Sequence, residues 1–324
     1  MNTSIDRLAS HRATVNLNAL MRSPAFLPFV GLVLVSVFMV FASDKFLTTT
    51  NLENIARQVS INAIIAVGMT CVILTGGIDL SVGPVMALSG TLTAGLMMAG
   101  VPPELAIVAG LLTGIAFGVG NGVFVAYLRM PPIIVTLATM GIARGLALLY
   151  TDGYPISGLP AWFAFFGRDS VLGIQVPILI MLIMYALAYV LLQHTRVGRY
   201  IYAIGGNEEA VRLSGIRAPR FKLLVYGISG LTAAVAGLVL TSRLMSGQPN
   251  AGVSFELDAI AAVVLGGASI AGGRGVIIGT LIGAMLLGVL NNGLNMLGVS
   301  PYVQSVIKGG IILLAIFISR QRGK

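Results

Sequence analysis

The chain has very little charge for its length. Only 10% of its 324 residues are charged, whereas about 25% is usual in soluble domains. Hydrophobic residues make up 56% of the sequence, and the mean hydropathy is +0.95. A water-soluble core of this size could not hide so much apolar surface. The composition therefore excludes a soluble protein and predicts an integral membrane protein.

Residue types that commonly bind metals and nucleotides are scarce as well. Cys71 is the only cysteine, so an intrachain disulfide is excluded. His11 and His194 are the only histidines, and both lie in charged flanks, which argues against a histidine metal cluster within a span. No lysine lies in the Gly-Lys-Ser or Gly-Lys-Thr sequence of a phosphate-binding loop. We therefore expect no enzyme activity and no bound cofactor or metal.

Glycine, by contrast, is abundant. The chain has 41 glycines, although each costs about 1 kcal/mol relative to alanine inside a soluble helix. In membranes small residues let helices approach closely. Two sets recur every four residues: Gly110, Gly114, Gly118 and Gly122, and Gly275, Gly279 and Gly283. We expect both sets at tight helix contacts, and a solute or ion path beside them is the alternative.

The apolar runs predict an all-α polytopic membrane bundle. A helix needs about 20 apolar residues to cross a bilayer, and shorter pieces occur where they are buried in protein. We expect about ten transmembrane helices, with eight full spans plus re-entrant pieces as the alternative. A single transmembrane domain, 26–319, follows a tail at 1–25 and precedes a tail at 320–324. The predicted spans are 26–43, 57–75, 79–99, 104–128, 132–150, 172–193, 221–241, 258–271, 275–296 and 301–319.

The positive charges are distributed unevenly between the two sides of this topology. Of the 20 lysines and arginines, 14 lie on inner segments, 4 on outer segments, and Arg144 and Lys308 within spans. This positive-inside bias predicts that both termini of the multi-pass protein are cytoplasmic. The net charge of +9 is therefore a topology signal, and we expect lipid rather than nucleic acid as a partner.

A short internal repeat accompanies the spans. Residues 72–77, VILTGG, resemble residues 262–267, AVVLGG, and both segments run from outside to inside in the predicted topology. Corresponding interrupted helices in two halves of a chain are frequent in transporters. Chance similarity between glycine-rich segments is the alternative.

Two polar sites in or beside spans are candidates for the pathway or a gate, because ionisable groups within the bilayer are costly. Asp79 and Ser81 lie in the glycine-rich segment 75–83, where Asp79 either caps the first turn of the next helix or has a pathway role. Arg144 lies within its span, where it either snorkels outward or pairs with an acid.

Amide side chains in the ninth span are further pathway candidates. Asn291 and Asn295 lie one turn apart on one helix face. They bond either a polyhydroxyl solute or, as we favour, a neighbouring helix. We expect Lys308 to bond carbonyl groups or an acid.

The longest basic segment between spans, residues 194–220, contains five arginines against Glu208 and Glu209. Asn207 can cap a short helix, and both glutamates would lie in its first turn, where the helix dipole favours acids. Gly215 would end this helix. So short a helix is not stable alone, which indicates that it packs against something else.

Three motifs together resemble one family. GRYIYAIGGNEEAVRLSGI at 198–216 resembles the cytoplasmic coupling segment in permeases of the ribose, xylose and arabinose class of ATP-binding-cassette (ABC) importers. TGGIDLSVG at 75–83 and LDAIAAVVLGGASIAGGRG at 257–275 are similar to two further motifs of that family. The resemblance covers essentially the whole chain after the first 40 residues.

The resemblance implies a homodimeric permease of the bacterial inner membrane, with a fold similar to vitamin B12-type importers. It also implies a separate cytoplasmic ATPase that binds ATP, a periplasmic sugar-binding protein and a monosaccharide, such as ribose, xylose or arabinose, as the small-molecule substrate. The ATPase-coupling residues would be Gly198, Gly205, Asn207, Glu208, Glu209, Ala210, Leu213 and Gly215. Alternatives are a permease for a nucleoside, branched-chain amino acid or signalling furanose, an ion-coupled carrier that uses Asp79, and a non-transporting scaffold.

Overall fold

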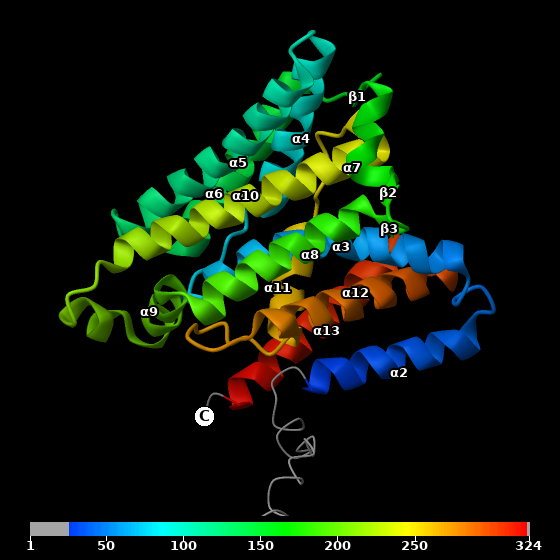
Figure 1. Ribbon diagram of the computed structural model, residues 1–324. Coiled ribbons are helices and arrows are strands. Elements are labelled where there is room, and N and C mark those ends of the chain that lie inside the picture. The colour runs from blue at the N-terminus through cyan, green and yellow to red at the C-terminus, as the bar shows by residue number, and fades with distance from the viewer. Residues whose placement is uncertain (1–25, 323–324) are drawn as a thin grey trace, which may run out of the picture.

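The computed structural model describes residues 26–322 and is predominantly helical (Figure 1). Every predicted span contains a helix. These helices are α2 (Phe26–Ala42), α3 (Thr49–Leu74), α4 (Val82–Met98), α5 (Pro103–Ala126), α6 (Pro132–Thr151), α8 (Val176–Tyr189), α10 (Ala218–Leu244), α11 (Phe255–Leu265), α12 (Ile277–Met296) and α13 (Pro301–Arg322). The tail 1–25 lies outside the described residues, whereas residues 320–322 continue α13.

The connections are mostly short. The outer connection between α6 and α8 contains the two-residue strands β1 (Ile156–Ser157), β2 (Ser170–Val171) and β3 (Ile174–Gln175), and the short helix α7 (Phe165–Arg168). β1 pairs with β4 (Ser246–Gly247), and β2 pairs with β3. The basic segment forms a helix of its own, α9 (Arg196–Leu213).

Six helices within residues 26–322 are long and apolar enough to cross a membrane: α3, α5, α6, α8 with the π-helical turn Val190–His194, α10 and α12. The apolar helices α2 and α4 are shorter, at 17 residues each. The 11 residues of α11 cannot span a bilayer, which needs about 20. The predicted eighth span is therefore an interrupted helix.

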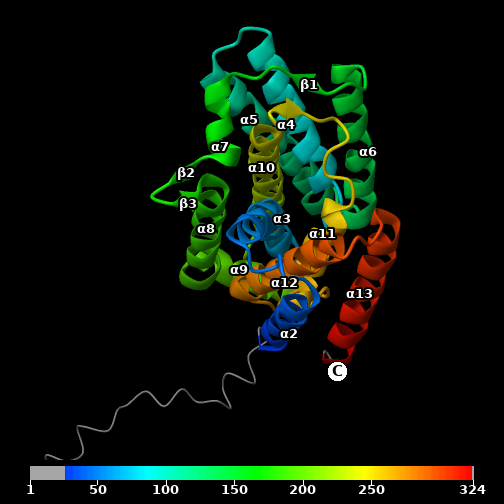
Figure 2. The ribbon, with the colours of Figure 1, turned by 90° about the vertical axis from the view of Figure 1, so that its right-hand side faces the viewer.

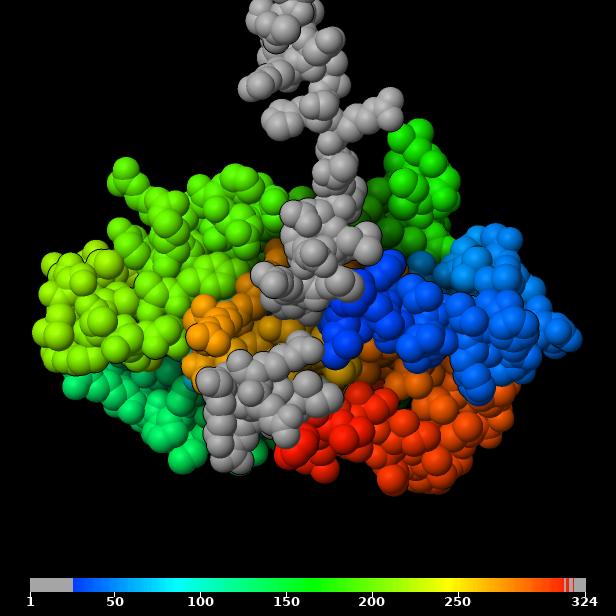
Figure 3. All heavy atoms as spheres, turned by 90° about the horizontal axis from the view of Figure 1, so that it is seen from below, coloured from blue at the N-terminus to red at the C-terminus, as the bar shows by residue number. Residues whose placement is uncertain are grey.

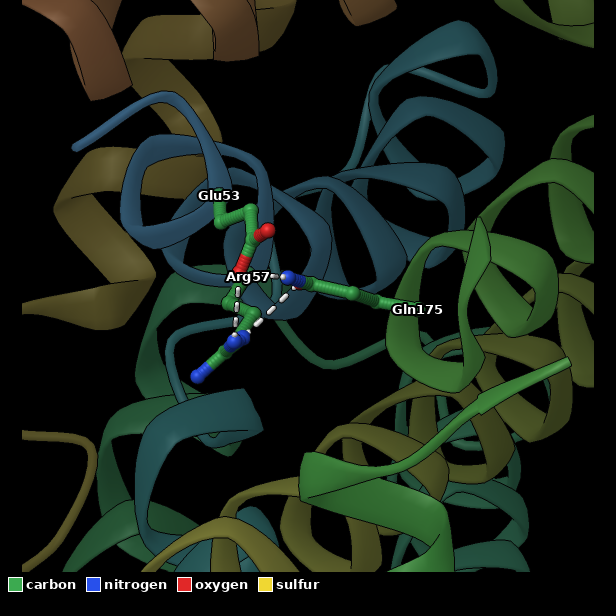
Figure 4. Close-up of polar contacts among 3 residues, drawn as sticks. All are labelled: Glu53, Arg57 and Gln175. Atoms are coloured by element: carbon green, nitrogen blue, oxygen red, sulfur yellow. Dashed lines mark hydrogen bonds and ion pairs between the residues drawn. The ribbon is translucent and has the colours of Figure 1, made fainter. Parts of the chain in front are cut away.

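Helix α3 differs most from its prediction, because it begins at Thr49 instead of residue 57. Charged residues stopped the hydropathy-based span, but the structure places them in a side-chain network (Figure 4). Arg57 Nε donates to Gln175 Oε1 over 2.8 Å, and Arg57 Nη2 donates to Glu53 Oε2 over 3.1 Å. Gln175 Nε2 completes the triangle with Glu53 Oε2 over 3.1 Å, so the start of α3 is bound to the start of α8.

The predicted glycine contacts between helices are confirmed except at Gly275, which precedes α12 and lies in the connector. Helix α3 lies near the centre of the bundle (Figure 2), and α10 packs against α3, α4 and α5. A methyl group at Gly118 of α5 would overlap the Tyr226 carbonyl oxygen of α10, and one at Gly283 of α12 would overlap the Ala262 carbonyl oxygen of α11. These helices touch through their backbones, which requires glycine at these positions.

The two ends of the bundle are different. In Figure 1 the whole of α9 and the last turn of α13 lie toward the left-hand side, and α2 runs from near the middle of the view to the right. Figure 3 shows α2 beside the C-terminal helices on the face seen from below, with α9 at one edge of that face. The start of α3, β3 and α7 lie toward the right-hand side (Figure 1), and α3 and β3 carry the Glu53–Arg57–Gln175 network.

Candidate functional site

The basic segment folds into two short helices that meet at Asn207. Its backbone there is non-helical, with φ −160° and ψ 97°. Asn207 Oδ1 accepts a hydrogen bond from the Ala210 amide over 2.9 Å, which is the geometry of an N-cap. The predicted capped helix is therefore confirmed. The sequence analysis did not foresee the helix before it, which starts after Thr195, whose hydroxyl accepts from the Gly198 amide over 3.1 Å.

Gly215 ends the second helix as predicted. Its φ is +80°, a left-handed conformation that favours glycine. The Gly215 amide donates to Arg212 O over 3.0 Å, and the Ile216 amide donates to Val211 O over 3.3 Å. This bond pattern with an apolar contact between Val211 and Ile216 is a Schellman motif. The short helix is thus fixed at both ends by its own sequence.

The eight predicted coupling residues fall into two groups. Six have exposed positions: Asn207, Glu208, Glu209, Ala210, Leu213 and Gly215. Leu213 is 77% exposed, an unusual position for a large apolar side chain at the end of a membrane protein that faces water. Gly198 and Gly205 instead pack against the rest of the chain. A methyl group at Gly205 would overlap both the Leu74 carbonyl oxygen and the Gly273 amide nitrogen.

A groove of about 1050 Å³ lies beside the exposed helix. Its walls are the α5–α6 turn, residues 125–132, and the segment 208–222. Lys222 Nζ donates to Glu208 Oε2 over 2.6 Å, so α10 and α9 are tied together at its edge. Sequence reasoning missed the α5–α6 turn, although Arg129 in that turn was counted among the inner charges.

An ion pair orders the exposed helix surface. Two nitrogens of Arg212 donate to the two carboxylate oxygens of Glu209, over 3.0 and 2.5 Å. These hydrogen bonds lower the pKa of Glu209 and raise that of Arg212. Both side chains are 62% exposed, so water screens the pair and it adds little to stability. The two hydrogen bonds hold the carboxylate and the guanidinium in one arrangement on the exposed surface of the helix.

Asp79 and Ser81 lie in a fully buried polar network. Asp79 is 1% exposed. Its Oδ1 accepts from the Ser81 amide and hydroxyl over 3.0 and 2.6 Å, and its Oδ2 accepts from Ser229 Oγ of α10 over 2.7 Å. Asn121 of α5 donates to Ser81 Oγ over 2.9 Å. The predicted capping role is wrong, because no side chain caps α4. Asp79 joins the α3–α4 connector to α10 instead.

The asparagines of α12 mostly bond neighbouring helices, as favoured. Asn295 Oδ1 accepts from Gln304 of α13 over 2.8 Å. Asn292 and Asn51 of α3 bond each other over 2.8 and 3.2 Å. The Asn291 Oδ1 atom is buried and has no hydrogen-bond partner in the described part of the chain. Its pathway role remains a prediction.

Arg144 and Lys308 have different partners. Lys308 Nζ donates to Asp258 Oδ2 over 3.0 Å, so the prediction that Lys308 bonds carbonyl groups or an acid is confirmed, with an acid as the partner. Arg144 neither snorkels nor forms a direct ion pair. Its Nη1 donates to the Pro249 and Ala251 carbonyl oxygens over 2.5 and 2.8 Å. The reason is that residues 245–254, the connector between α10 and α11, run past α6 with free carbonyl groups.

Comparison with known proteins identifies the family. Residues 51–316 match the family described as "Branched-chain amino acid transport system / permease component". The chain is 52% identical over 297 residues to the ribose import permease protein RbsC of Bacillus subtilis (strain 168), covering 91% of this chain and 92% of that protein. It is 50% identical over 284 residues to the ribose import permease protein RbsC of Escherichia coli (strain K12), covering 86% and 88%.

A further relative has another sugar in its name. The D-allose transport system permease protein AlsC of Escherichia coli (strain K12) is 42% identical over 293 residues, covering 90% of each chain. No solved structure matches the chain. The resemblance to sugar permeases is confirmed, and the protein is a multi-pass inner-membrane protein. From its match over residues 51–316, the chain belongs to the family of transport-system permease components.

Proposed function

We propose that this chain is the membrane-spanning subunit of an ABC importer that moves ribose, or a closely related monosaccharide, across the inner membrane. The observation on which this proposal rests is the identity of about half of all aligned residues with two ribose import permeases, over nearly the full length of each. Because the two alignments cover 91% and 86% of this chain, the identity supports a common activity and not just a common fold.

The proposed arrangement has ten membrane segments within one domain, residues 26–319, and cytoplasmic termini. The position of the last turn of α13 toward the same side as α9 supports a shared side for the C-terminus and the basic segment (Figure 1). We infer a fold similar to vitamin B12-type importers and an assembly of two copies of this chain. A separate ATPase binds and hydrolyses ATP, a periplasmic protein delivers the sugar, and this chain is not an enzyme.

The geometry of α9 supports its role as the contact with the ATPase. An exposed two-turn helix fixed at both ends can transmit force without unfolding, and Leu213 offers an apolar group to a partner. The adjacent groove adds the α5–α6 turn to the contact surface. An ATPase that binds one conformation of the permease more tightly than another shifts the equilibrium between them.

Branched-chain amino acids form the second candidate substrate class, because the family description names them. Reconstitution separates the two classes. The chain is placed in proteoliposomes with its ATPase and binding protein, and uptake of ribose, xylose, allose, a nucleoside and leucine is measured with and without ATP. We expect ATP-dependent uptake of ribose. Leucine uptake without sugar uptake would contradict the sugar proposal, and uptake that needs no ATP would favour an ion-coupled carrier.

A further inference from the structure

A cluster of four charged residues lies between α6, α11 and α13. Arg144 comes from α6, Glu256 and Asp258 from the first turn of α11, and Lys308 from α13. Besides the Lys308–Asp258 ion pair, Arg144 and Glu256 are close enough for their opposite charges to attract. Figure 2 shows α6 and α13 along one side of the molecule with α11 between them. We call these four residues the charged cluster.

The charged cluster lies where two interrupted helices begin. Helix α11 starts at Phe255, directly after the connector 245–254 that Arg144 holds. The first turn of α4 rests on the same connector, because a methyl group on Gly83 or Gly252 would overlap the carbonyl oxygen of the other. Helix N-termini expose N–H groups without intrahelical partners. Interrupted helices that meet inside a bundle are a common way to form a solute site in transporters.

Charged side chains in the interior of the bundle lower the stability of the fold unless they are well paired. Removing an ion pair from water costs several kcal/mol per ion, and well-packed apolar side chains are often at least as stable. Asp258 is only 5% exposed. The Oε2 atom of Glu256 is buried and accepts no hydrogen bond from any residue in the range 26–322. This unused acceptor packs against Gly83 in the first turn of α4, and Arg144 is its nearby cation. A buried acceptor without a donor indicates that the charged cluster binds something besides itself.

We propose that the charged cluster is a recognition site that binds the transported sugar partway across the membrane; this rests on the proposed function. A hydroxyl group both donates and accepts, so it can bridge a carboxylate and a cation. Glu256 and Asp258 supply acceptors, while Arg144, Lys308 and the first N–H groups of α11 supply donors. The two positive and two negative charges cancel, which favours a neutral polyhydroxyl solute over an ion.

A purely structural role makes different predictions. In that case the Lys308–Asp258 pair would only bind α13 to α11, and Glu256 would be dispensable. The tests use the full chain purified with its ATPase in lipid nanodiscs, without nucleotide and without the binding protein, so that only the permease can bind sugar. Binding of radiolabelled ribose is measured by equilibrium dialysis, with unlabelled ribose or leucine as the competitor.

The first variant is Glu256→Gln, which keeps the size of the side chain but removes its charge. We expect saturable ribose binding by the unchanged protein and at least about tenfold weaker binding by the variant, because hydrogen bonds to charged groups are strong. Glu104→Gln, at an exposed glutamate of α5, is the matched control and should bind normally. Equal binding by the Glu256→Gln and unchanged proteins, or equal displacement of ribose by leucine, would overturn the proposal.

The second variant exchanges the ion pair, Asp258→Lys together with Lys308→Asp. An exchanged pair preserves the link between α11 and α13. We therefore expect the double variant to be more thermally stable, and to co-purify with more ATPase, than either single variant. Ribose binding should stay lost in the double variant. Recovery of full ribose binding would show a structural role only. If the unchanged protein binds no ribose but still imports it with ATP, the recognition site is wrong and the proposed function stands. Absence of ATP-dependent sugar uptake would instead contradict the proposed function.

Discussion

Asp79 is the centre of a buried hydrogen-bond network between the α3–α4 connector and two helices. Its two oxygens accept three hydrogen bonds, from the amide and hydroxyl of Ser81 and the hydroxyl of Ser229. Ser81 in turn accepts from Asn121. The network joins the α3–α4 connector to α5 and α10, and its residues are buried, so a donor that loses its partner is costly.

We predict that Asp79→Ala lowers stability more than Asp79→Asn. Alanine leaves buried donors without acceptors, at about 1–3 kcal/mol for each such group. Asparagine keeps one acceptor oxygen for Ser81, and the Ser229 hydroxyl can accept from the new amide. The measurement is the temperature at which the detergent-purified protein loses its monodisperse chromatographic peak. Equal losses in the two variants would show that these hydrogen bonds do not stabilise the fold.

Glu209 is the residue with which to test the contact with the ATPase. We predict that Glu209→Arg inserts and folds normally, because the Glu209–Arg212 pair is exposed and screened by water. The variant reverses the charge of a surface that faces the proposed ATPase, so co-purification of the ATPase and ATP-dependent uptake should be lost. The control is Glu104→Arg, which reverses the charge of an exposed glutamate in the first turn of α5, away from the coupling helix. Co-purification and uptake are measured for both variants. Normal co-purification by Glu209→Arg would contradict the coupling role.

Residue roles could be predicted from sequence where their partners are local. Asn207 bonds an amide three residues away, so the capping pattern was sufficient to find it. Asp79 has the same local signal, but Ser229 lies 150 residues away and takes one of its oxygens. The partners of Arg144 are over 100 residues away. Nothing in one sequence specifies such pairs, because they depend on which helices pack together.

At the scale of elements, α9 touches both glycine-rich connectors of the permease. The Gly273 amide, between α11 and α12, donates to Leu74 O at the end of α3 over 3.0 Å. Gly205 of α9 packs directly on these two groups. The three family motifs, far apart in the sequence, therefore meet at one point. A movement of α9 would be passed to the connectors that precede α4 and α12.

We predict that Gly205→Ala impairs transport and that Gly206→Ala does not. The methyl group at residue 205 would overlap backbone atoms, whereas one at residue 206 meets nothing within 4 Å. Overpacking costs about 1–3 kcal/mol, enough to lower uptake by about tenfold or more if the strain falls on one conformation. Uptake and ATPase activity are measured in the same proteoliposomes. Equal uptake by both variants would show that α9 does not act through this contact.

Helix existence was predictable, and helix boundaries were less so. Each of the ten predicted apolar segments contains a helix, since a membrane helix must be apolar over most of its length. The start of α3 was missed because Glu53 and Arg57 are charged, yet their network with Gln175 satisfies them. The eighth span was predicted to be short, at 258–271, but its end was placed six residues too late, because Ala268 and its apolar neighbours continue the hydropathy pattern after the helix ends at Leu265.

At the scale of the whole molecule, the fold has a tightly packed centre and peripheral first and last helices. Helices α3, α5 and α10 meet through glycine backbones, whereas α2 has only two buried residues, Pro28 and Met39. Hydropathy identifies each span but not its neighbours, because lipid and protein surroundings are equally apolar. The orientation of the protein in the membrane, in contrast, can be predicted from sequence, since it depends on where the lysines and arginines lie along the chain.

Thiol labelling of intact cells tests this sidedness directly. The native cysteine, Cys71, is 0% exposed, so the unchanged protein should not react with a membrane-impermeant maleimide. Leu172 is 98% exposed in the turn between β2 and β3, and Leu213 is 77% exposed at the end of α9. With α9 in the cytoplasm, Leu172→Cys should be labelled in spheroplasts, while Leu213→Cys should be labelled only after lysis. The reverse pattern would place α9 outside, where no ATPase could reach it.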